Sequence, residues 1–497
     1  MTEKKLFGTN GIRGIFGKDL SIEFLIDITF SIGSFFEKGP IVLGYDGRSS
    51  SFAIQKIISA VLMSMGIDVY TMGMTPTPCL QFTVKNLRSS GGIMITASHN
   101  PKEYNGIKPI STHGFELSRD DEIKIESIYY EKKFMRGDSG SFGNLFKLDV
   151  LGQYIDKVLS FIDIDIIRRS NLKIIMDCGN GVQSLVAPLI GRILGCEVLI
   201  MNGYIDPNFS ARGSEPKMDN LSSLTELVKK TSSDLGVAYD GDGDRSIFCD
   251  EKGIIHWGDK TGSILSYHLI KNKKMDTTIV CPVNSSLVIS KIGKLVKKDV
   301  YFTKVGSVEV SYGMKNTNSL IGFEENGGFF YGPLNLVRDG AITTALVLEM
   351  MSYHKQEKQG QTTKSVDKLT DKKSSLSDIF SMFDNTFQYK SSLNLSSNDD
   401  MQHVLDVCAA HGSVFKIERI DGVKIWFDAE SWIMFRPSGT EPLIRIYGES
   451  NDKSLLDSKV KEYLNLINNI LNPADGYMIT FLILFFIIRK SGNDPNG

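Results

Sequence analysis

The chain has 497 residues, of which 41% are hydrophobic and 23% charged, and its formal net charge is −2. A single hydrophobic core stops growing at about 250–300 residues, so this length predicts several domains. The near-neutral charge gives no basis for electrostatic capture of nucleic acid, and we expect no nucleic acid partner.

The cysteines and the N-terminal residues both bear on the compartment of the protein. The six cysteines are scattered without CxxC pairs, which predicts small buried thiols in a reducing compartment. The opening residues 2–5 are polar, and no apolar segment typical of a signal peptide follows them. We therefore expect a cytoplasmic protein.

The first candidate site along the chain is the stretch 7–14 (FGTNGIRG), which places three glycines around Arg13. Glycine lets the backbone come close to a ligand, and a guanidinium can then point at an anion. An ordinary turn with a solvated arginine explains the same residues, so this stretch decides nothing alone.

Three segments share the order strand, polar turn, helix, strand. In the first, a strand at residues 41–43 leads through a polar turn into a helix over 54–65 and a second strand. The order recurs over residues 172–200 and 278–302. Such units favour largely parallel sheets, and their wide spacing excludes a solenoid. The pattern predicts three related α/β domains.

A serine and a histidine lie at the end of a predicted strand. The hexapeptide 96–101 (TASHNP) follows the apolar run 91–95, which predicts a short buried strand. The Asn-Pro pair ends regular structure, so Ser98 and His99 lie side by side on a tight, exposed loop. Ligands of open α/β sheets bind beyond the carboxyl ends of strands. Taken alone, the hexapeptide fits a plain surface turn better than a nucleophile.

Residues 240–245 (DGDGDR) place three carboxylates, Asp240, Asp242 and Asp244, at alternate positions with glycine between them. Such a loop can wrap a hard cation, and oxygen ligands suit Mg²⁺. The spacing partly resembles a calcium-binding EF-hand loop, but the sixth position is Arg245 instead of glycine, and both flanks predict strands. Because the carboxylates would repel one another without a cation, we expect a metal site rather than an acidic turn.

The stretch 322–328 (GFEENGG) places carboxylates and an amide in a glycine-flanked loop. Glu324 and Asn326 can grip sugar hydroxyls, and Thr303 and Gly306 could line the same pocket. An acidic turn is an equally good interpretation of this loop alone.

The stretch 436–442 (RPSGTEP) follows a predicted strand. Its arginine, hydroxyl groups and backbone N–H groups have the composition of a phosphate-binding loop. A proline-bracketed turn explains the same residues equally well.

The C-terminal part changes in character. The polar stretch 354–375 predicts a linker or surface insertion, and the alternating strands and terminal helix beyond it predict a smaller α+β domain. The apolar run 477–488 is shorter than the roughly 20 residues of a membrane-spanning helix. Three interpretations stay open: a membrane-surface anchor, a segment packed on the body or a partner, and an extension without function. We expect membrane contact only under the first.

Together these loops offer a serine, a Mg²⁺ site, groups that bind sugar hydroxyls and groups that bind phosphate. This combination predicts phosphoryl transfer on a sugar. Because the loops lie in four regions of the chain, we expect a cleft between domains. The expected divisions are an α/β domain at 1–150 with the serine loop, an α/β domain at 151–255 with the Mg²⁺ loop, an α/β domain at 256–353 with the sugar loop, the polar stretch 354–375, an α+β phosphate-binding domain at 376–472, and the tail 473–497.

Six motifs resemble, in the same order and at similar spacing, those of the α-D-phosphohexomutase family. They are FGTNGIRG, TASHNPKEYNGIKPI, DGDGDR, FEENGG, RDG at 338–340 and RPSGTEP, and the phosphoglucomutase/phosphomannomutase branch looks closest over residues 1–472. The resemblance implies four domains around a central cleft, three related α/β domains and a smaller α+β domain. It implies hexose phosphates as substrates, Mg²⁺ as cofactor and hexose 1,6-bisphosphate as intermediate and activator. We expect a monomer or dimer.

Under this resemblance Ser98 would be a phosphoserine that gives its phosphate to a hexose phosphate and takes the other phosphate back. Mg²⁺ would be held by Asp240, Asp242 and Asp244 with an oxygen on Ser98. The reaction centre would be lined by Arg13, His99, Lys108 and Arg245, the sugar would be read by Glu324 and Asn326 beside Thr303 and Gly306, and the second phosphate would be held by Arg436, Ser438, Gly439, Thr440 and Arg445.

The sequence departs from the family pattern at two motifs, and the second departure bears on the substrate. Asn10 stands where many members carry aspartate or serine, and the FEENGG loop differs from the glutamine-serine-glycine-histidine form of phosphoglucosamine mutases. We therefore expect an intramolecular phosphotransferase acting on glucose and/or mannose phosphates. A phosphoglucosamine mutase and a sugar phosphatase using the same phosphoserine stay open. A non-enzymatic, membrane-associated binding protein is a third alternative, against which the intact Ser98 and the three aspartates argue.

Overall fold

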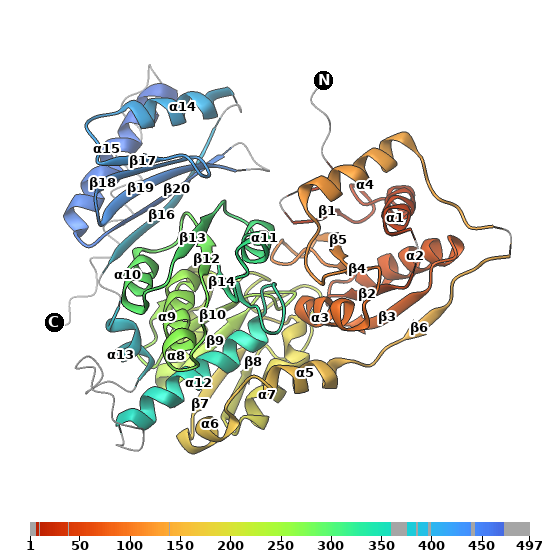
Figure 1. The fold of residues 1–497 in the computed structure, drawn as a ribbon, viewed down its shortest axis with the longest axis horizontal. Helices are drawn as coiled ribbons and strands as arrows, with labels where there is room; N and C mark the ends of the chain where they lie inside the picture. The colour runs from red at the N-terminus through yellow and green to blue at the C-terminus, as the bar shows by residue number, and fades with distance from the viewer. Residues whose placement is uncertain are drawn as a thin grey trace. The chain divides into compact units, whose positions relative to one another are not determined.

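The computed structural model describes residues 6–8, 10–37, 39–138, 140–358, 375–383, 386–395, 399–438 and 443–471. The chain divides into two compact units, Met1–Asp384 and Asn385–Gly497. Three of the four sheets in the described residues belong to the first unit and one to the second (Figure 1).

The first sheet carries the serine loop. Its strands are β1 (Ile12–Ile15), β2 (Ile41–Tyr45), β3 (Val69–Met74), β4 (Gly91–Ile95), β5 (Tyr104–Ser111) and β6 (Leu145–Lys147), and its helices are α1 (Ile22–Phe36), α2 (Ser51–Ser64), α3 (Thr77–Leu87) and α4 (Arg119–Glu131). The strand order is β1-β5-β4-β2-β3-β6, with β2 parallel to both β3 and β4. Apolar residues of α1, α2 and α4 cover one face, and those of α3 cover the other. The predicted strand 91–95 is confirmed and fully buried.

The second sheet carries the aspartate loop. Its strands are β7 (Lys173–Asp177), β8 (Glu197–Met201), β9 (Leu235–Tyr239), β10 (Ser246–Asp250) and β11 (Ile255–His256), and its helical segments are α5 (Leu151–Leu159), α6 (Ile164–Ser170), η1 (Val182–Leu185), α7 (Ala187–Ile193), η2 (Met218–Asn220) and α8 (Ser222–Thr231). The order is β11-β10-β9-β7-β8. The predicted single helix after β7 is divided, because Val186, with φ −127°, interrupts it between η1 and α7. The DGDGDR turn joins two antiparallel strands, as predicted.

The third sheet carries the sugar loop. Its strands are β12 (Ile279–Pro282), β13 (Val300–Thr303), β14 (Ile321–Phe323) and β15 (Phe329–Tyr331), and its helices are α9 (Gly258–Lys271), α10 (Leu287–Val296), α11 (Ser307–Thr317) and α12 (Gly340–Lys358), with α13 (Leu376–Ser381) following. The order is β13-β12-β14-β15, and β12 is parallel to β13 and β14. The third strand–helix–strand unit is therefore confirmed.

The second unit contains an antiparallel sheet, as predicted for an α+β domain. Its elements are β16 (Phe387–Asn394), α14 (Asp399–Ala410), β17 (Lys416–Glu418), β18 (Val423–Asp428), β19 (Ser431–Pro437), β20 (Leu443–Ser450) and α15 (Lys453–Leu471). The order is β16-β20-β19-β18-β17. Apolar residues of α14 and α15 pack with one face of the sheet in a single core. Strand β16 and helix α14 were not predicted from the sequence.

Helix α12 is longer than its composition suggested. It continues to Lys358, so the first five residues of the predicted polar linker are helical. Two of these residues bind carbonyl oxygens of α6 through their side chains: Lys355 Nζ donates to Ser170 O at 2.9 Å, and Gln356 Nε2 donates to Ile166 O at 3.3 Å. Most of that stretch and the whole apolar tail lie outside the described residues. None of the described helices is long and apolar enough to cross a membrane.

The prediction of buried thiols is confirmed. All six cysteines are buried and free, namely Cys79, Cys178, Cys196, Cys249, Cys281 and Cys408. Burial raises the pKa of the Cys178 and Cys408 thiols to about 12. The thiolate is the reactive form of cysteine, so these side chains act as small apolar core groups.

A buried hydrogen bond joins α5 to the start of α12. The Tyr154 hydroxyl donates to Asp339 Oδ2 at 2.6 Å. Burial raises the pKa of Asp339 to about 6, and the Tyr154 hydroxyl opposes this shift because it stabilises the carboxylate. The folded carboxyl therefore binds a proton more strongly than the unfolded one, and the contribution of Asp339 to stability falls as the pH rises from about 4 through 6.

We predict that Tyr154→Phe lowers the free energy of unfolding by about 1–3 kcal/mol near pH 7.5, roughly the cost of an unpaired buried acceptor, and by less near pH 5. Above its pKa the folded Asp339 is a carboxylate that loses its donor, whereas below its pKa the carboxyl is neutral. Urea unfolding at the two pH values measures the difference. Tyr239→Phe is the matched control, because the Tyr239 hydroxyl bonds the neutral Thr344 hydroxyl at 2.8 Å. Equal losses for Tyr154→Phe at both pH values would contradict the prediction.

Candidate active site

Ser98 follows strand β4, as predicted, but it is buried rather than exposed, with 1% of its surface accessible. Its φ of 49° lies in the left-handed region, which residues other than glycine rarely adopt. Its N–H donates to Thr96 Oγ1 at 2.8 Å, and its hydroxyl donates to Asp240 Oδ2 at 3.1 Å. Strained backbone of this kind concentrates at functional sites, and here it turns the hydroxyl toward the aspartate loop.

Arg48 holds the Ser98 loop, although the sequence around Arg48 predicts only a turn. The side chain donates at 2.6–2.8 Å to four carbonyl oxygens of the loop, those of Ser98, Asn100, Pro101 and Tyr104. Its Nε donates to Asp46 Oδ2 at 3.0 Å, and both side chains are almost fully buried. An Asp-x-Arg sequence directly after β2, the neighbour of β4, is the signal that could have revealed this support.

The three aspartates fill the turn between β9 and β10 and are buried. One carboxylate oxygen from each of Asp240, Asp242 and Asp244 lies within 4.8 Å of the others. Gly241 allows the turn to approach the serine loop, because a Cβ at this position would lie 2.9 Å from Ser98 O. Two loops that are far apart in the sequence therefore meet at Ser98.

Two carboxylate oxygens of the aspartate cluster have no hydrogen-bond donor among the described residues. Burial and the neighbouring carboxylates raise the pKa of Asp240 well above its usual value. Burial acts in the same direction on Asp242, but the Lys108 ammonium, the Thr77 hydroxyl and Arg338 outweigh it and lower the pKa. The Oδ1 atoms of Asp242 and Asp244 are buried and accept no hydrogen bond from the described residues. These orphaned oxygens beside a third carboxylate fit a hard divalent cation such as Mg²⁺.

We predict that Mg²⁺ stabilises the folded protein through this cluster. At a concentration about 100 times its dissociation constant, the ion should raise the free energy of unfolding by about 2.7 kcal/mol, and a chelator should remove the gain. Asp242→Asn should lose most of this stabilisation, since it removes a charged ligand. Chemical denaturation with Mg²⁺ and with chelator measures the effect. Asp219→Asn, at an exposed aspartate on η2, is the control; equal Mg²⁺ stabilisation of both variants would contradict the site.

The side-chain nitrogens of Lys108 and Arg245 lie 3.7–3.9 Å from the aspartate carboxylates, and the Arg245 backbone N–H donates to Asp240 Oδ1 at 3.1 Å. Lys108 Nζ is 3.7 Å from an oxygen of both Asp242 and Asp244, and it is also 3.7 Å from Glu116 Oε1. Arg245 Nε is 3.9 Å from Asp240 Oδ2. Neither Lys108 Nζ nor Arg245 Nε makes a hydrogen bond with the described residues. Both cations can therefore donate hydrogen bonds to the oxygens of a phosphoryl group. Thr77 and Glu116 are site residues that the sequence analysis missed.

Arg13 and His99 complete the set predicted to surround Ser98. Arg13 lies on β1 and donates to Asn100 Oδ1 at 2.5 Å, while burial lowers its pKa to about 10. His99 Nδ1 lies 3.4 Å from Ser98 Oγ. Burial, and then Arg245 and Arg13, lower the pKa of His99 well below its usual value. Its imidazole is therefore neutral at physiological pH and a weak base, suited to hydrogen bonding.

The sugar loop connects β14 to β15. Glu324 is buried and accepts a hydrogen bond from Arg338 Nη1 at 3.2 Å; burial raises its pKa, and Arg338 opposes this shift. Asn326 Oδ1 accepts from the N–H of Gly328 at 3.2 Å. The Thr303 hydroxyl donates to the carbonyl oxygen of the adjacent Lys304 at 2.7 Å. Gly306 precedes α11 with φ 144°, a conformation suited to glycine.

The predicted phosphate-binding residues that the structure describes lie on β19 and β20 of the second unit. Arg436 on β19 is the direct cross-strand partner of Arg445 on β20. Its Nε donates to Asp421 Oδ2 at 2.5 Å. The Asp421 carboxylate therefore balances the charge of Arg436 opposite Arg445. Ser438 N donates to Leu443 O at 2.9 Å, and Gly439 and Thr440 lie outside the described residues.

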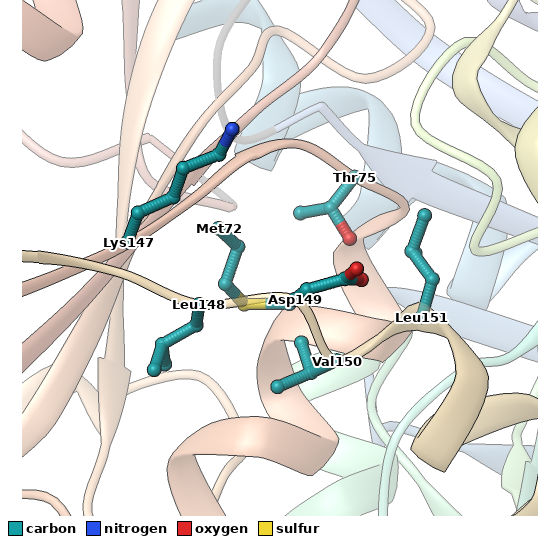
Figure 2. Close-up of a pocket in the computed structure, with 7 residues that line it drawn as sticks. All are labelled: Met72, Thr75, Lys147, Leu148, Asp149, Val150 and Leu151. Atoms are coloured by element: carbon teal, nitrogen blue, oxygen red, sulfur yellow. The ribbon is translucent and has the colours of Figure 1, made fainter.

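A separate pocket lies at the connection between β6 and α5, where the chain leaves the first sheet (Figure 2). It has a volume of about 450 Å³. Its lining residues are Met72, Thr75, Lys147, Leu148, Asp149, Val150 and Leu151. It includes none of the residues that the sequence predicted for the reaction, so the site is defined by the Ser98 and aspartate loops.

Comparison with known proteins decides the family. Models of phosphoglucomutase/phosphomannomutase match in order: alpha/beta/alpha domain I at residues 4–136, domain II at 152–253, domain III at 257–374 and the C-terminal domain at 393–465. The chain belongs to the phosphoglucomutase/phosphomannomutase family. It is therefore an isomerase of the α-D-phosphohexomutase superfamily, and the predicted fold class of three α/β domains and a smaller C-terminal domain is confirmed.

Two relatives of this phosphohexomutase and one solved structure illustrate the similarity. The phosphoglucosamine/phosphogalactosamine mutase of Sulfurisphaera tokodaii is 38% identical over 93% of this chain and 99% of that protein. The phosphoglucomutase/phosphomannomutase of Thermococcus kodakarensis is 33% identical over 95% of this chain and 99% of that protein. A phosphoglucomutase/phosphomannomutase family protein from Burkholderia thailandensis has the same fold, with a TM-score of 0.80 at 22% identity, covering 95% of this chain and 99% of that one.

Proposed function

We propose that this phosphohexomutase interconverts hexose 1-phosphate and hexose 6-phosphate, with Ser98 as phosphate carrier and hexose 1,6-bisphosphate as intermediate. The observation that carries the proposal is the hydrogen bond from the Ser98 hydroxyl to Asp240 Oδ2 at 3.1 Å. It places an oxygen able to carry phosphate against a cluster of three carboxylates that fits a divalent cation. Phosphoryl transfer depends mainly on such positioning and charge stabilisation.

The proposed reaction has two balanced transfers. In the first, the free hydroxyl of a hexose monophosphate attacks the phosphorus atom on Ser98, and the bond from phosphorus to the serine oxygen breaks. The proton of the sugar hydroxyl passes to the serine oxygen as that bond breaks, and the neutral imidazole of His99, 3.4 Å from Ser98 Oγ, would hydrogen-bond the serine oxygen. In the second transfer the Ser98 oxygen attacks the phosphorus atom of the other phosphate, the bond from that phosphorus to the sugar oxygen breaks, and the serine proton passes to the sugar oxygen.

Charge stabilisation would come from residues around the transferring group. Lys108 Nζ and Arg245 Nε make no hydrogen bond with the described residues. Arg13 points to the Ser98 loop, where it donates to Asn100. These three cations would offset charge on the phosphoryl oxygens. Mg²⁺ bound by Asp240, Asp242 and Asp244 would supply further neutralisation of that charge.

The sugar is proposed to be glucose and/or mannose, read through Glu324 and Asn326. One observation favours an amino sugar as a second candidate. The loop carries Glu325 beside Glu324, and carboxylates suit the ammonium group of a hexosamine. The relative from Sulfurisphaera tokodaii, named for amino-sugar phosphates, supports the same candidate.

A coupled assay with glucose, mannose and glucosamine 1-phosphates, Mg²⁺ and a trace of hexose 1,6-bisphosphate tests the proposal. We expect the 6-phosphate of glucose or mannose to form without net release of inorganic phosphate. A kcat/KM at least about tenfold higher for glucosamine 1-phosphate, equal to about 1.4 kcal/mol of transition-state binding, would establish the amino-sugar candidate instead. Release of inorganic phosphate without isomer exchange would indicate a phosphatase and contradict the mutase proposal.

A further inference from the structure

We infer that Arg338 is a positioning residue that connects the cation-binding loop to the sugar loop, so that one buried side chain sets the geometry of both. The inference rests on the proposed function. Arg338 comes directly before α12 and its side chain is 3% exposed. Its Nη2 donates to Asp244 Oδ2 at 2.5 Å, and its Nη1 donates to Glu324 Oε2 at 3.2 Å.

The backbone fixes the starting point of this side chain. Phe330 on β15 forms an isolated antiparallel bridge with Arg338, and the N–H of Asp339 donates to Phe329 O at 3.1 Å. The arginine therefore starts from the edge of the sugar hairpin and not from a free loop. A planar guanidinium presents donors in a fixed fork, which allows two carboxylates to be held at a defined separation.

The sugar loop leaves space for the arginine stem. A Cβ placed on Gly328 would lie 2.3 Å from Arg338 Cδ, 2.7 Å from its Cγ and 3.2 Å from Glu324 Oε2. Real Cβ atoms do not approach other atoms so closely, so any side chain at position 328 would push the stem aside. Gly328 and Arg338 therefore act as a matched pair: the missing side chain of one makes room for the other.

The contact also determines which atoms remain for ligands. Arg338 engages Oδ2 of Asp244, and Oδ1 of the same carboxylate is the buried oxygen that accepts no hydrogen bond from the described residues. The arginine thus orients the carboxylate so that Oδ1 is the oxygen left for a cation. The same guanidinium turns Glu324 into a fixed acceptor at the start of the sugar loop. Loss of Arg338 should weaken both Mg²⁺ binding and sugar-phosphate binding.

The test measures the two affinities separately by calorimetry, with Mg²⁺ alone and with glucose 6-phosphate, so that neither depends on turnover. In Arg338→Ala each dissociation constant should rise about tenfold, as expected for a lost charge-assisted hydrogen bond. Arg338→Lys should recover one affinity and not the other, because a point charge cannot hold both carboxylates. Arg119→Ala is the matched control, since Arg119 also bridges two carboxylates, Glu122 and Glu126, on the remote α4.

A second variant tests the pairing without changing any charge. Gly328→Ala should raise both dissociation constants in the wild-type background and have no further effect in Arg338→Ala, where the stem is absent. Gly152→Ala on α5, with no atom within 4 Å of its added Cβ, is the control. Wild-type affinity for either ligand in folded Arg338→Ala, or additive effects of the two changes, would overturn the inference. A wild-type protein that binds glucose 6-phosphate without isomerising it would instead refute the proposed function alone.

Discussion

Replacement of Ser98 by alanine is expected to lower kcat by roughly six orders of magnitude, the scale seen when a nucleophile is removed from a covalent mechanism. No other group can readily replace the Ser98 hydroxyl oxygen, because Ser98 lies on a strained, buried loop and its hydroxyl donates to Asp240. Ser98→Ala removes only the hydroxyl, and the support from Arg48 uses the backbone carbonyl of residue 98, so the loop itself should remain.

The measurement is a coupled mutase assay with added hexose 1,6-bisphosphate, accompanied by mass spectrometry of the wild-type protein for phosphate on the peptide that contains Ser98. Thr77→Val is a suitable comparison, since the Thr77 hydroxyl also donates to an aspartate of the cluster, Asp242, at 2.7 Å. It should lower kcat by less than about tenfold, the effect of one hydrogen bond. Turnover of Ser98→Ala at the wild-type rate would remove Ser98 from the mechanism.

Arg48→Met is expected to destabilise the folded protein by about 3–5 kcal/mol, the range for breaking a buried ion pair by removing one partner. The change leaves Asp46 buried without its cation and removes the donor from four carbonyl oxygens of the Ser98 loop. Methionine keeps much of the volume, so the loss reports on charge and hydrogen bonding more than on a cavity.

Urea unfolding of the wild-type protein and the variant measures the difference in their free energies of unfolding. Arg48→Lys should recover only part of the stability, because lysine cannot supply the same fork of donors. Arg169→Met is a control at an exposed arginine in the last turn of α6, and it should change stability by less than about 0.5 kcal/mol. A loss of that small size in Arg48→Met would show that the loop holds its shape without the arginine.

Features encoded by neighbouring residues could be predicted from the sequence. The periodicity of apolar residues located the strand–helix–strand units, and the alternation of aspartate and glycine identified the buried cluster that fits a cation. The final helix, predicted around 453–471, is α15. Each of these depends on spacing within a few residues, which is what the helix and strand periods record.

Features that depend on distant partners could not be predicted. Thr77 and Asp242 are 165 positions apart, and nothing local to either residue indicates their hydrogen bond. Arg338 was recognised only as part of a motif, because its role depends on the space beside Gly328. The burial of Ser98 arises in the same way, from the close approach of Gly241. The domain boundaries and the roles of individual site residues stay predictions.

The hydrogen bonds of Arg48 have a consequence for a residue that would gain and lose a dianionic group in every cycle. They hold the Ser98 loop through the carbonyl oxygens of the main chain, whereas the hydroxyl that would be phosphorylated takes no part in them. The Ser98 carbonyl oxygen therefore anchors the loop, and the Ser98 hydroxyl oxygen would carry the phosphate. The phosphorylated and unphosphorylated forms can share one backbone conformation, so the loop would not have to refold each time the phosphate leaves.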